Sequence, residues 1–101
     1  MATLLVLYKT PADKAAFDKY YAEIHVPLAK KMPGLKTYEI SQGALTGPGS
    51  ESTHLVATLT FDSLADLQAA LGSPEGQAAA GDLPNFAGAG ADLLMFETKS
   101  V

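Results

Sequence analysis

The stretch "TLLVLYK" at residues 3–9 is rich in branched and aromatic side chains, which is typical of a β-strand. Successive side chains of a strand point to opposite faces of its sheet. Here both faces are apolar, with Leu4, Val6 and Tyr8 on one face and Leu5 and Leu7 on the other. One face can pack on helices, and the second needs a further cover.

A helix is predicted directly after this strand. Thr10 and Pro11 suit its N-cap and its first helical position. Apolar residues then recur at three- and four-residue steps and form one stripe: Phe17, Tyr20, Tyr21, Ile24 and Leu28. Pro27 removes a backbone donor from this helix and clashes with the preceding turn, so we expect the helix to kink or restart near His25.

The rest of the chain continues the alternation of strands and helices. The predicted elements are strands at 35–45 and 53–61, a helix that is capped by Asp62 or Ser63 and ends at Gly72, a short helical piece at 74–80, and a strand at 91–99. The order β-α-β-β-α-β is typical of the ferredoxin-like α+β fold, an antiparallel four-stranded sheet with both helices on one face. With no repeat or linker, residues 1–101 are expected to form a single domain.

The second apolar face of the first strand has no cover within the chain, because every predicted helix lies on the other side of the sheet. The simplest cover is a second copy of the chain, packed sheet against sheet with the same surface used twice. The sequence therefore predicts a homodimer.

Composition narrows the classes of partner. The net charge is −4, and all seven cations are lysines that do not gather into a basic patch, so we expect no nucleic-acid partner. No apolar run approaches the length of a membrane span and no signal peptide is recognised, so we expect a cytoplasmic protein without a membrane partner. The absence of cysteine excludes thiolate chemistry, and two separated histidines make no metal motif.

Three segments, in this order and spacing, resemble one family: "YYAEIHVPLAKKMPGL" at 20–35, "FDSLADLQAAL" at 61–71 and "GDLPNF" at 81–86. They are similar to the EthD-like family of the dimeric α/β-barrel superfamily, named for ethyl tert-butyl ether degradation. The resemblance implies a dimer whose sheets form a barrel, with a cavity between helices and sheet in each protomer. Superfamily relatives include lactone isomerases, polyketide cyclases, cofactor-free monooxygenases and haem-degrading enzymes, so the fold alone does not determine the chemistry. No motif supports haem or another cofactor, and none is expected.

His25 is the candidate acid–base residue, because an imidazole titrates near neutral pH and the kink would aim it at the cavity wall. Asp82 is the candidate that would orient it, and its alternative is a turn carboxylate or a cap. The substrate-binding candidates are Tyr21, one helical turn before the histidine, and Asn85 and Phe86 of the late motif. His54 begins a strand after a loop and is expected to be exposed.

The leading hypothesis is a small catabolic or biosynthetic protein that binds an apolar, oxygenated small molecule and performs cofactor-free acid–base chemistry at His25. The chemistry would be of the isomerase, cyclase or monooxygenase type. The alternative is a non-catalytic accessory or binding protein that serves a partner oxygenase, and a third hypothesis makes the dimer itself an assembly module.

Overall fold

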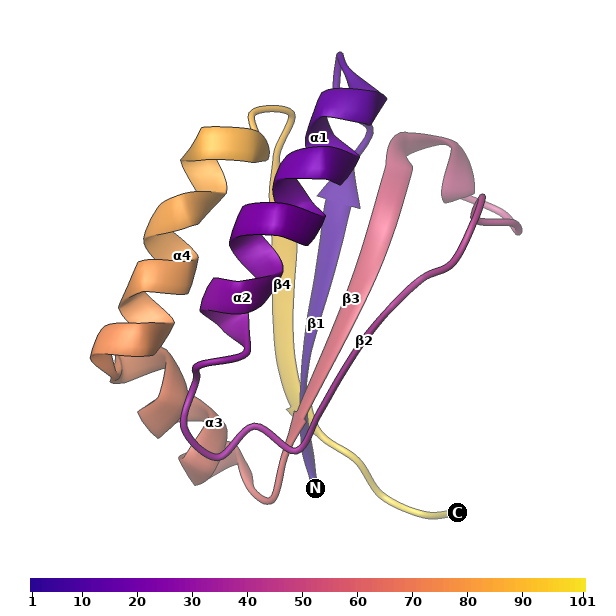
Figure 1. Ribbon diagram of the computed structural model, residues 1–101. Coiled ribbons are helices and arrows are strands. Elements are labelled where there is room, and N and C mark those ends of the chain that lie inside the picture. Colours follow the sequence, from indigo (N-terminus) through magenta and orange to yellow (C-terminus); the bar gives the residue numbers. More distant parts are fainter.

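The computed structural model describes residues 1–101 and has the predicted β-α-β-β-α-β order (Figure 1). Its elements are β1 (Ala2–Lys9), α1 (Lys14–Tyr20), the π-helical turn η1 (Tyr21–His25), α2 (Val26–Ala29), β2 (Thr37–Ile40), the 3-10 turn η2 (Ser50–Ser52), β3 (Thr53–Phe61), α3 (Leu64–Gly72), α4 (Pro74–Phe86) and β4 (Ala91–Glu97). The strands form one antiparallel sheet in the order β2-β3-β1-β4, and the helices lie on one side of it. The predicted ferredoxin-like α+β fold is confirmed.

The core lies between the sheet and the helices. From Leu4 to Tyr8 the buried side chains of β1 alternate as the sequence predicts. The register partners of Ala2, Leu4 and Val6 in β3 are buried as well. The largest fully buried side chains are Tyr8 of β1, Phe61 of β3 and Leu67 of α3. The sheet and the helices therefore meet in one core, on one face of the sheet.

The other face of the sheet is also apolar and carries no helix (Figure 1). Leu5 of β1 lies opposite Leu94 of β4, and Leu7 lies opposite Val56 of β3. Leu94 is 50% exposed and Phe96 is 40% exposed, which is unusual for large apolar side chains of a regular strand. We call the set Leu5, Leu7, Val56, Leu94 and Phe96 the open face.

The first helix begins later than predicted. Its N-cap is Asp13, whose side chain accepts a hydrogen bond from the Ala16 amide at 3.0 Å, and not Thr10. The reason is that the Thr10 amide bonds to the Ser52 carbonyl at 3.1 Å, which keeps the chain attached to the start of β3. The β2 strand is also shorter than the predicted 35–45, and Gly43 turns the chain in a positive-φ conformation beyond its end.

The last helix is longer than predicted and includes the "GDLPNF" segment. Ser73 caps it by accepting from the Gly76 amide at 3.0 Å, with Pro74 at its first position. The helix then passes beyond residue 80 and contains Pro84, so the interpretation of Asp82 as a turn carboxylate is wrong. Contacts that Asp82 makes with the first helical segment outweigh the weak helix propensity of this stretch.

Helices α3 and α4 approach each other very closely at Gly76. A Cβ atom at this position would lie 2.0 Å from the Ala70 carbonyl oxygen and 2.7 Å from the Leu71 Cα atom. Both obstacles are backbone atoms, which cannot rotate away as a side chain could.

None of the helices is both long and apolar enough to cross a membrane.

Candidate functional site

The histidine is aimed by a widened helical turn. In η1 the Val26 amide bonds to the Tyr21 carbonyl, five residues back, where a regular helix would bond four residues back. The α-helix restarts at Val26, so the predicted restart near His25 is confirmed, and Pro27 supplies the physical cause. The turn directs His25 inward, leaving it 5% exposed, while Ile24 faces solvent and is 46% exposed. The expectation that Ile24 packs in the apolar stripe is therefore wrong.

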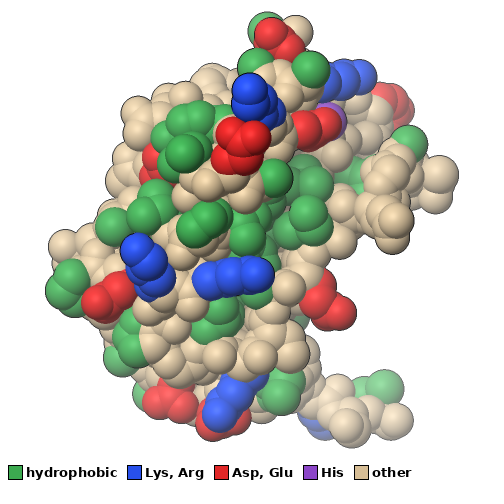
Figure 2. Space-filling model, viewed as in Figure 1, with side chains coloured by type: hydrophobic (Ala, Val, Ile, Leu, Met, Phe, Trp, Pro, Cys, Tyr) green, Lys and Arg blue, Asp and Glu red, His purple; other side chains and the backbone are tan.

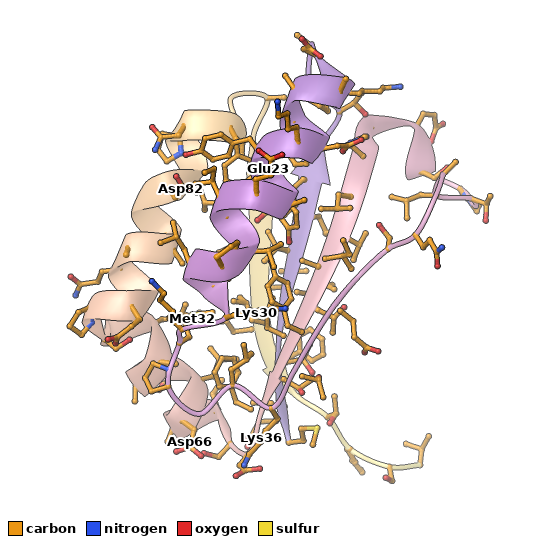
Figure 3. The ribbon with its side chains drawn as sticks, in the orientation of Figure 1. Glu23, Lys30, Met32, Lys36, Asp66 and Asp82 are labelled. Atoms are coloured by element: carbon orange, nitrogen blue, oxygen red, sulfur yellow. The ribbon has the colours of Figure 1, made fainter.

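Asp82 of α4 is the partner of His25, as predicted. Its Oδ2 lies 3.0 Å from His25 Nδ1. Its Oδ1 accepts from the Tyr20 hydroxyl at 2.6 Å and from the Asn85 side-chain amide at 3.0 Å. Figure 3 shows Asp82 directed from α4 toward the helix that carries Glu23. The carboxylate thus joins α4 to the helical segment formed by α1 and η1, with hydrogen bonds on both of its oxygens.

The electrostatics of the pair determine its protonation. Burial alone would raise the pKa of Asp82, but hydrogen bonds from Tyr20, Asn85 and His25 outweigh it and hold this pKa below the usual value. Burial lowers the pKa of His25, and the neighbouring carboxylate only partly offsets this. At neutral pH the pair is a carboxylate and a neutral imidazole. Since the carboxylate can only accept, Nδ1 carries the hydrogen and Nε2 keeps a free lone pair.

His25 lines a cavity between the helices and the sheet. Because Nδ1 is held by Asp82, which lies outside this cavity, Nε2 is the ring nitrogen on the cavity side. The cavity has a volume of about 40 Å³ and an almost entirely apolar lining. Its polar side-chain groups are the His25 imidazole and the hydroxyls of three tyrosines, Tyr8, Tyr21 and Tyr38. The Tyr8 hydroxyl lies 3.5 Å from His25 Nε2, and the hydroxyls of Tyr21 and Tyr38 lie 2.6 Å apart. A basic nitrogen and three phenols thus line one apolar chamber.

The predicted site residues divide into two groups in the structure. His25 and Tyr21 line the cavity. Asp82, Asn85 and Phe86 lie outside it: Asn85 bonds Asp82, and the Phe86 ring centre is 4.7 Å from that of His25. Asn85 and Phe86 instead line a shallow groove of about 540 Å³ between the start of α1 and the end of α4.

Sequence reasoning missed three residues that the structure places in this network: Tyr8, Tyr20 and Tyr38. Tyr8 lies on the same face of β1 as Leu4 and Val6, so the alternation of side chains along the strand already placed it on the helix side of the sheet. Tyr38 likewise alternates with the polar Thr37 and Glu39, but the sequence does not show that its strand lies beside β3 and so brings its hydroxyl to Tyr21.

His54 is only partly exposed, which contradicts the prediction. Its Nε2 lies 2.7 Å from Asp18 Oδ1, and its ring packs edge-on against Phe17 at 5.1 Å. The cause is a bulge at the start of β3: Tyr8 pairs with Leu55 and Lys9 with Thr53, which leaves His54 without a partner in β1. His54 does not line the cavity that His25 faces.

We expect stability to fall as the solution is acidified below about pH 6.5, the ordinary pKa of histidine. The pKa of His25 is lowered in the folded state, so the unfolded chain binds a proton that the folded chain excludes, and the free energy of unfolding decreases with falling pH. Asp82, whose folded pKa is also lowered, adds a second loss below about pH 4.

Urea unfolding at several pH values between 7.5 and 5 measures the first of these losses. His25→Gln should flatten the curve in this window, since glutamine does not titrate. A variant whose stability falls with pH as steeply as that of the wild type would contradict the assignment to His25.

Comparison with known proteins shows to which family the chain belongs and which solved structures share its fold. The model of the family described as EthD domain matches residues 9–90. An uncharacterized 11.0 kDa protein in the thcB-thcC intergenic region of Rhodococcus erythropolis is 37% identical over 101 residues, which cover 100% of this chain and 98% of that protein. The crystal structure of an ethyl tert-butyl ether degradation (EthD) family protein from Bacillus halodurans superposes with a TM-score of 0.89 at 33% identity, covering 98% of this chain and 99% of the other.

Two less similar structures share the fold. SnoaB from Streptomyces nogalater, a cofactor-independent oxygenase, superposes with a TM-score of 0.68 at 15% identity, covering 99% of this chain and 94% of the other. A dimeric ferredoxin-like protein from Jannaschia sp. superposes with a TM-score of 0.70 at 24% identity, covering 96% of this chain and 98% of the other.

Proposed function

The chain belongs to the EthD domain family, and on that premise we propose that it binds an apolar, oxygenated small molecule in the cavity and moves a proton on it at His25. The observation that carries the proposal is the pairing of His25 with Asp82, which leaves the Nε2 lone pair directed into an apolar chamber. This chemistry needs no cofactor, and it suits a catabolic or biosynthetic protein of the isomerase, cyclase or monooxygenase type.

The geometry supports a base more than a structural histidine. A carboxylate that accepts from Nδ1 holds the ring in the tautomer whose Nε2 can take a proton, and it stabilises the imidazolium that then forms. The lowered pKa of His25 keeps the imidazole unprotonated at neutral pH. Tyr20 and Asn85 in turn fix the carboxylate, so the base has a supported orientation.

The cavity must enlarge to hold such a ligand. Its volume of about 40 Å³ is enough for little more than one water molecule. Ligand sites usually have volumes of about 300 Å³ or more. Met32, Leu71 and Leu83 line the cavity with flexible or partly exposed side chains, and their movement is the simplest way to make room.

The alternative is a non-catalytic accessory protein that holds a small molecule for a partner oxygenase. The same cavity supports this function, because holding a ligand needs no free base.

SnoaB, which shares the fold, is a cofactor-independent oxygenase. That likeness keeps oxygenase chemistry among the candidate reactions of the catalytic hypothesis.

A screen of lactones, phenols and quinones tests the proposal, with binding followed by thermal shift and turnover by NMR. For a compound that is converted, His25→Gln should lower turnover by about 10²- to 10⁴-fold, the usual contribution of a positioned general base. Asp66→Asn changes an exposed residue of α3 that lines neither the cavity nor a groove, and it should leave turnover unchanged. Full turnover by His25→Gln would refute the acid–base function, and ligand binding without any conversion would favour the accessory protein.

We also propose that two copies of the chain associate through the open face. Large apolar side chains of a sheet are exposed there, and a second copy can cover them with the same surface. The Jannaschia protein of the same fold is dimeric, which agrees with this arrangement.

Sedimentation equilibrium at micromolar concentration should give twice the 10.5 kDa mass of the chain. Leu94→Lys places a charge in the open face and should yield monomers. Met95→Lys is the matched control, because Met95 is the next residue, is 48% exposed and points to the opposite side of the sheet. A wild-type mass near 10.5 kDa, or equal effects of both variants, would contradict the proposed interface.

A further inference from the structure

Two of the three tyrosine hydroxyls in the cavity can donate a hydrogen bond to a ligand. Tyr21 and Tyr38 share one hydrogen bond, so the hydroxyl that accepts in it keeps its own hydrogen free. The Tyr8 hydroxyl lies 3.5 Å from His25 Nε2, well beyond the usual length of about 2.7–2.9 Å for a hydroxyl hydrogen bond, so this contact is easily replaced. The cavity therefore offers two hydroxyl donors beside one basic nitrogen.

All three tyrosines stay protonated at neutral pH. Burial is the largest cause that raises the pKa of Tyr8, of Tyr21 and of Tyr38. Tyr38 adds to the shift of Tyr8 and of Tyr21, while Tyr21 only partly offsets the effect of burial on the pKa of Tyr8 and Tyr38. Each is therefore a hydrogen-bond donor and not a phenolate. In an apolar surrounding such donors stabilise a negatively charged oxygen far more than they would in water.

We propose that Tyr8, Tyr21 and Tyr38 form an oxyanion-binding site, and that the substrate is an apolar carbonyl compound with an acidic C–H bond next to the carbonyl. The inference rests on the proposed function of His25 and specifies its substrate class. His25 Nε2 takes the proton from the carbon, and the electron pair of the broken C–H bond moves to make an enolate. The carbonyl oxygen carries the new charge and accepts hydrogen bonds from Tyr8 and from the Tyr21–Tyr38 pair. Where the substrate has a C=C bond conjugated with the enolate, His25 returns the proton to the far carbon of that system, the double bond shifts and the carbonyl re-forms, which completes an isomerisation with no oxidant or cofactor consumed.

Tyr21 also links the cavity to a larger groove. This groove, of about 620 Å³, lies between α1 and the segment that leads from β2 to β3, and Tyr21, Ile40 and Leu55 are among its lining residues. The surface is hollowed on this side of the helices (Figure 2). A ligand whose body lies in this groove would reach the hydroxyls only if the Tyr21–Tyr38 contact opens as the cavity enlarges.

4-Nitrophenol is a suitable probe, because its hydroxyl gives up a proton and then carries negative charge, as an enol does. Its phenolate absorbs visible light, so the ionisation of the bound probe can be read directly at a pH below its own pKa. In the wild-type protein we expect the probe to bind as phenolate, with its proton transferred to His25 Nε2. Tyr8→Phe and Tyr38→Phe should each weaken phenolate binding by about 10- to 100-fold, the usual range for a hydrogen bond to a charged group.

His25→Gln should bind the probe without the phenolate band. Thr58→Val, which removes a hydroxyl from β3 on the opposite face of the sheet, is the control and should bind as the wild type does. A His25-dependent phenolate band that both tyrosine variants leave unchanged would overturn the oxyanion site while the acid–base function stands. Failure of the wild type to bind or to ionise the probe would also overturn it, and the screen of lactones and quinones decides the wider function separately.

Discussion

Replacing Asp82 by asparagine is expected to reverse the tautomer of His25 and to lower acid–base activity by about 10³- to 10⁴-fold, as the loss of the orienting carboxylate does in serine proteases. Asp82 accepts hydrogen bonds from three donors: Tyr20 and Asn85 donate to Oδ1, and His25 Nδ1 is the one donor to Oδ2. The asparagine oxygen can keep the bonds from Tyr20 and Asn85, so its amide group would face Nδ1. The imidazole must then carry its hydrogen on Nε2, and the lone pair that faces the cavity is lost.

The tautomer can be measured without knowing the substrate. Imidazole ¹⁵N chemical shifts distinguish a protonated from an unprotonated Nε2, and we expect the protonated form only in Asp82→Asn. Asp66→Asn is the control, because Asp66 is an exposed residue of α3 far from the histidine in the chain. An unchanged Nε2 signal in Asp82→Asn would show that the carboxylate does not hold the ring.

Replacing Gly76 by alanine is expected to cost more stability than any other single methyl group added to this chain. The new Cβ would lie 2.0 Å from the Ala70 carbonyl oxygen, so α3 and α4 must separate before it fits. Overpacking against atoms that can adjust costs about 1–3 kcal/mol, and backbone atoms adjust less readily, so we expect at least about 3 kcal/mol here.

Gly81→Ala is the matched control in the same helix. No atom lies within 4 Å of its added Cβ, and its φ is not positive. The alanine should therefore stabilise α4 by about 0.5–1 kcal/mol, as glycine replacements in helices do. Urea unfolding of both variants measures the difference. A Gly76→Ala protein as stable as the wild type would mean that the close contact between α3 and α4 is absent in solution.

The fold could be predicted from the sequence because its strands alternate and its first helix carries one apolar stripe. Both faces of β1 are apolar in the structure as they are in the sequence, and the β-α-β-β-α-β order follows from the turn residues between elements. The end of α4 could not be predicted in the same way. Glycine and Pro84 argue against a helix there, and tertiary contacts of this segment, among them those of Asp82 and the packing of Leu83 and Phe86 on the core, keep it helical.

The candidate site could be predicted only in part. Pro27, two residues after His25, indicated a disturbed helix, and the disturbance is a widened turn in the structure. The hydrogen bond between Tyr20 and Asp82 joins residues 62 positions apart, and no local pattern marks such a pair. The position of His54 depends on a bulge that appears only when two strands are paired.

The widened turn η1 also affects how relatives of different length are compared. A π-helical turn holds one residue more than an α-helical turn, so it acts as a one-residue insertion that leaves both flanking helices in place. A relative with a regular turn would carry its tyrosine and histidine three positions apart, and residues with that spacing still lie on one face of an α-helix. A single-position gap between Tyr21 and His25 in an alignment therefore marks a change of helical pitch, with the imidazole still directed at the carboxylate.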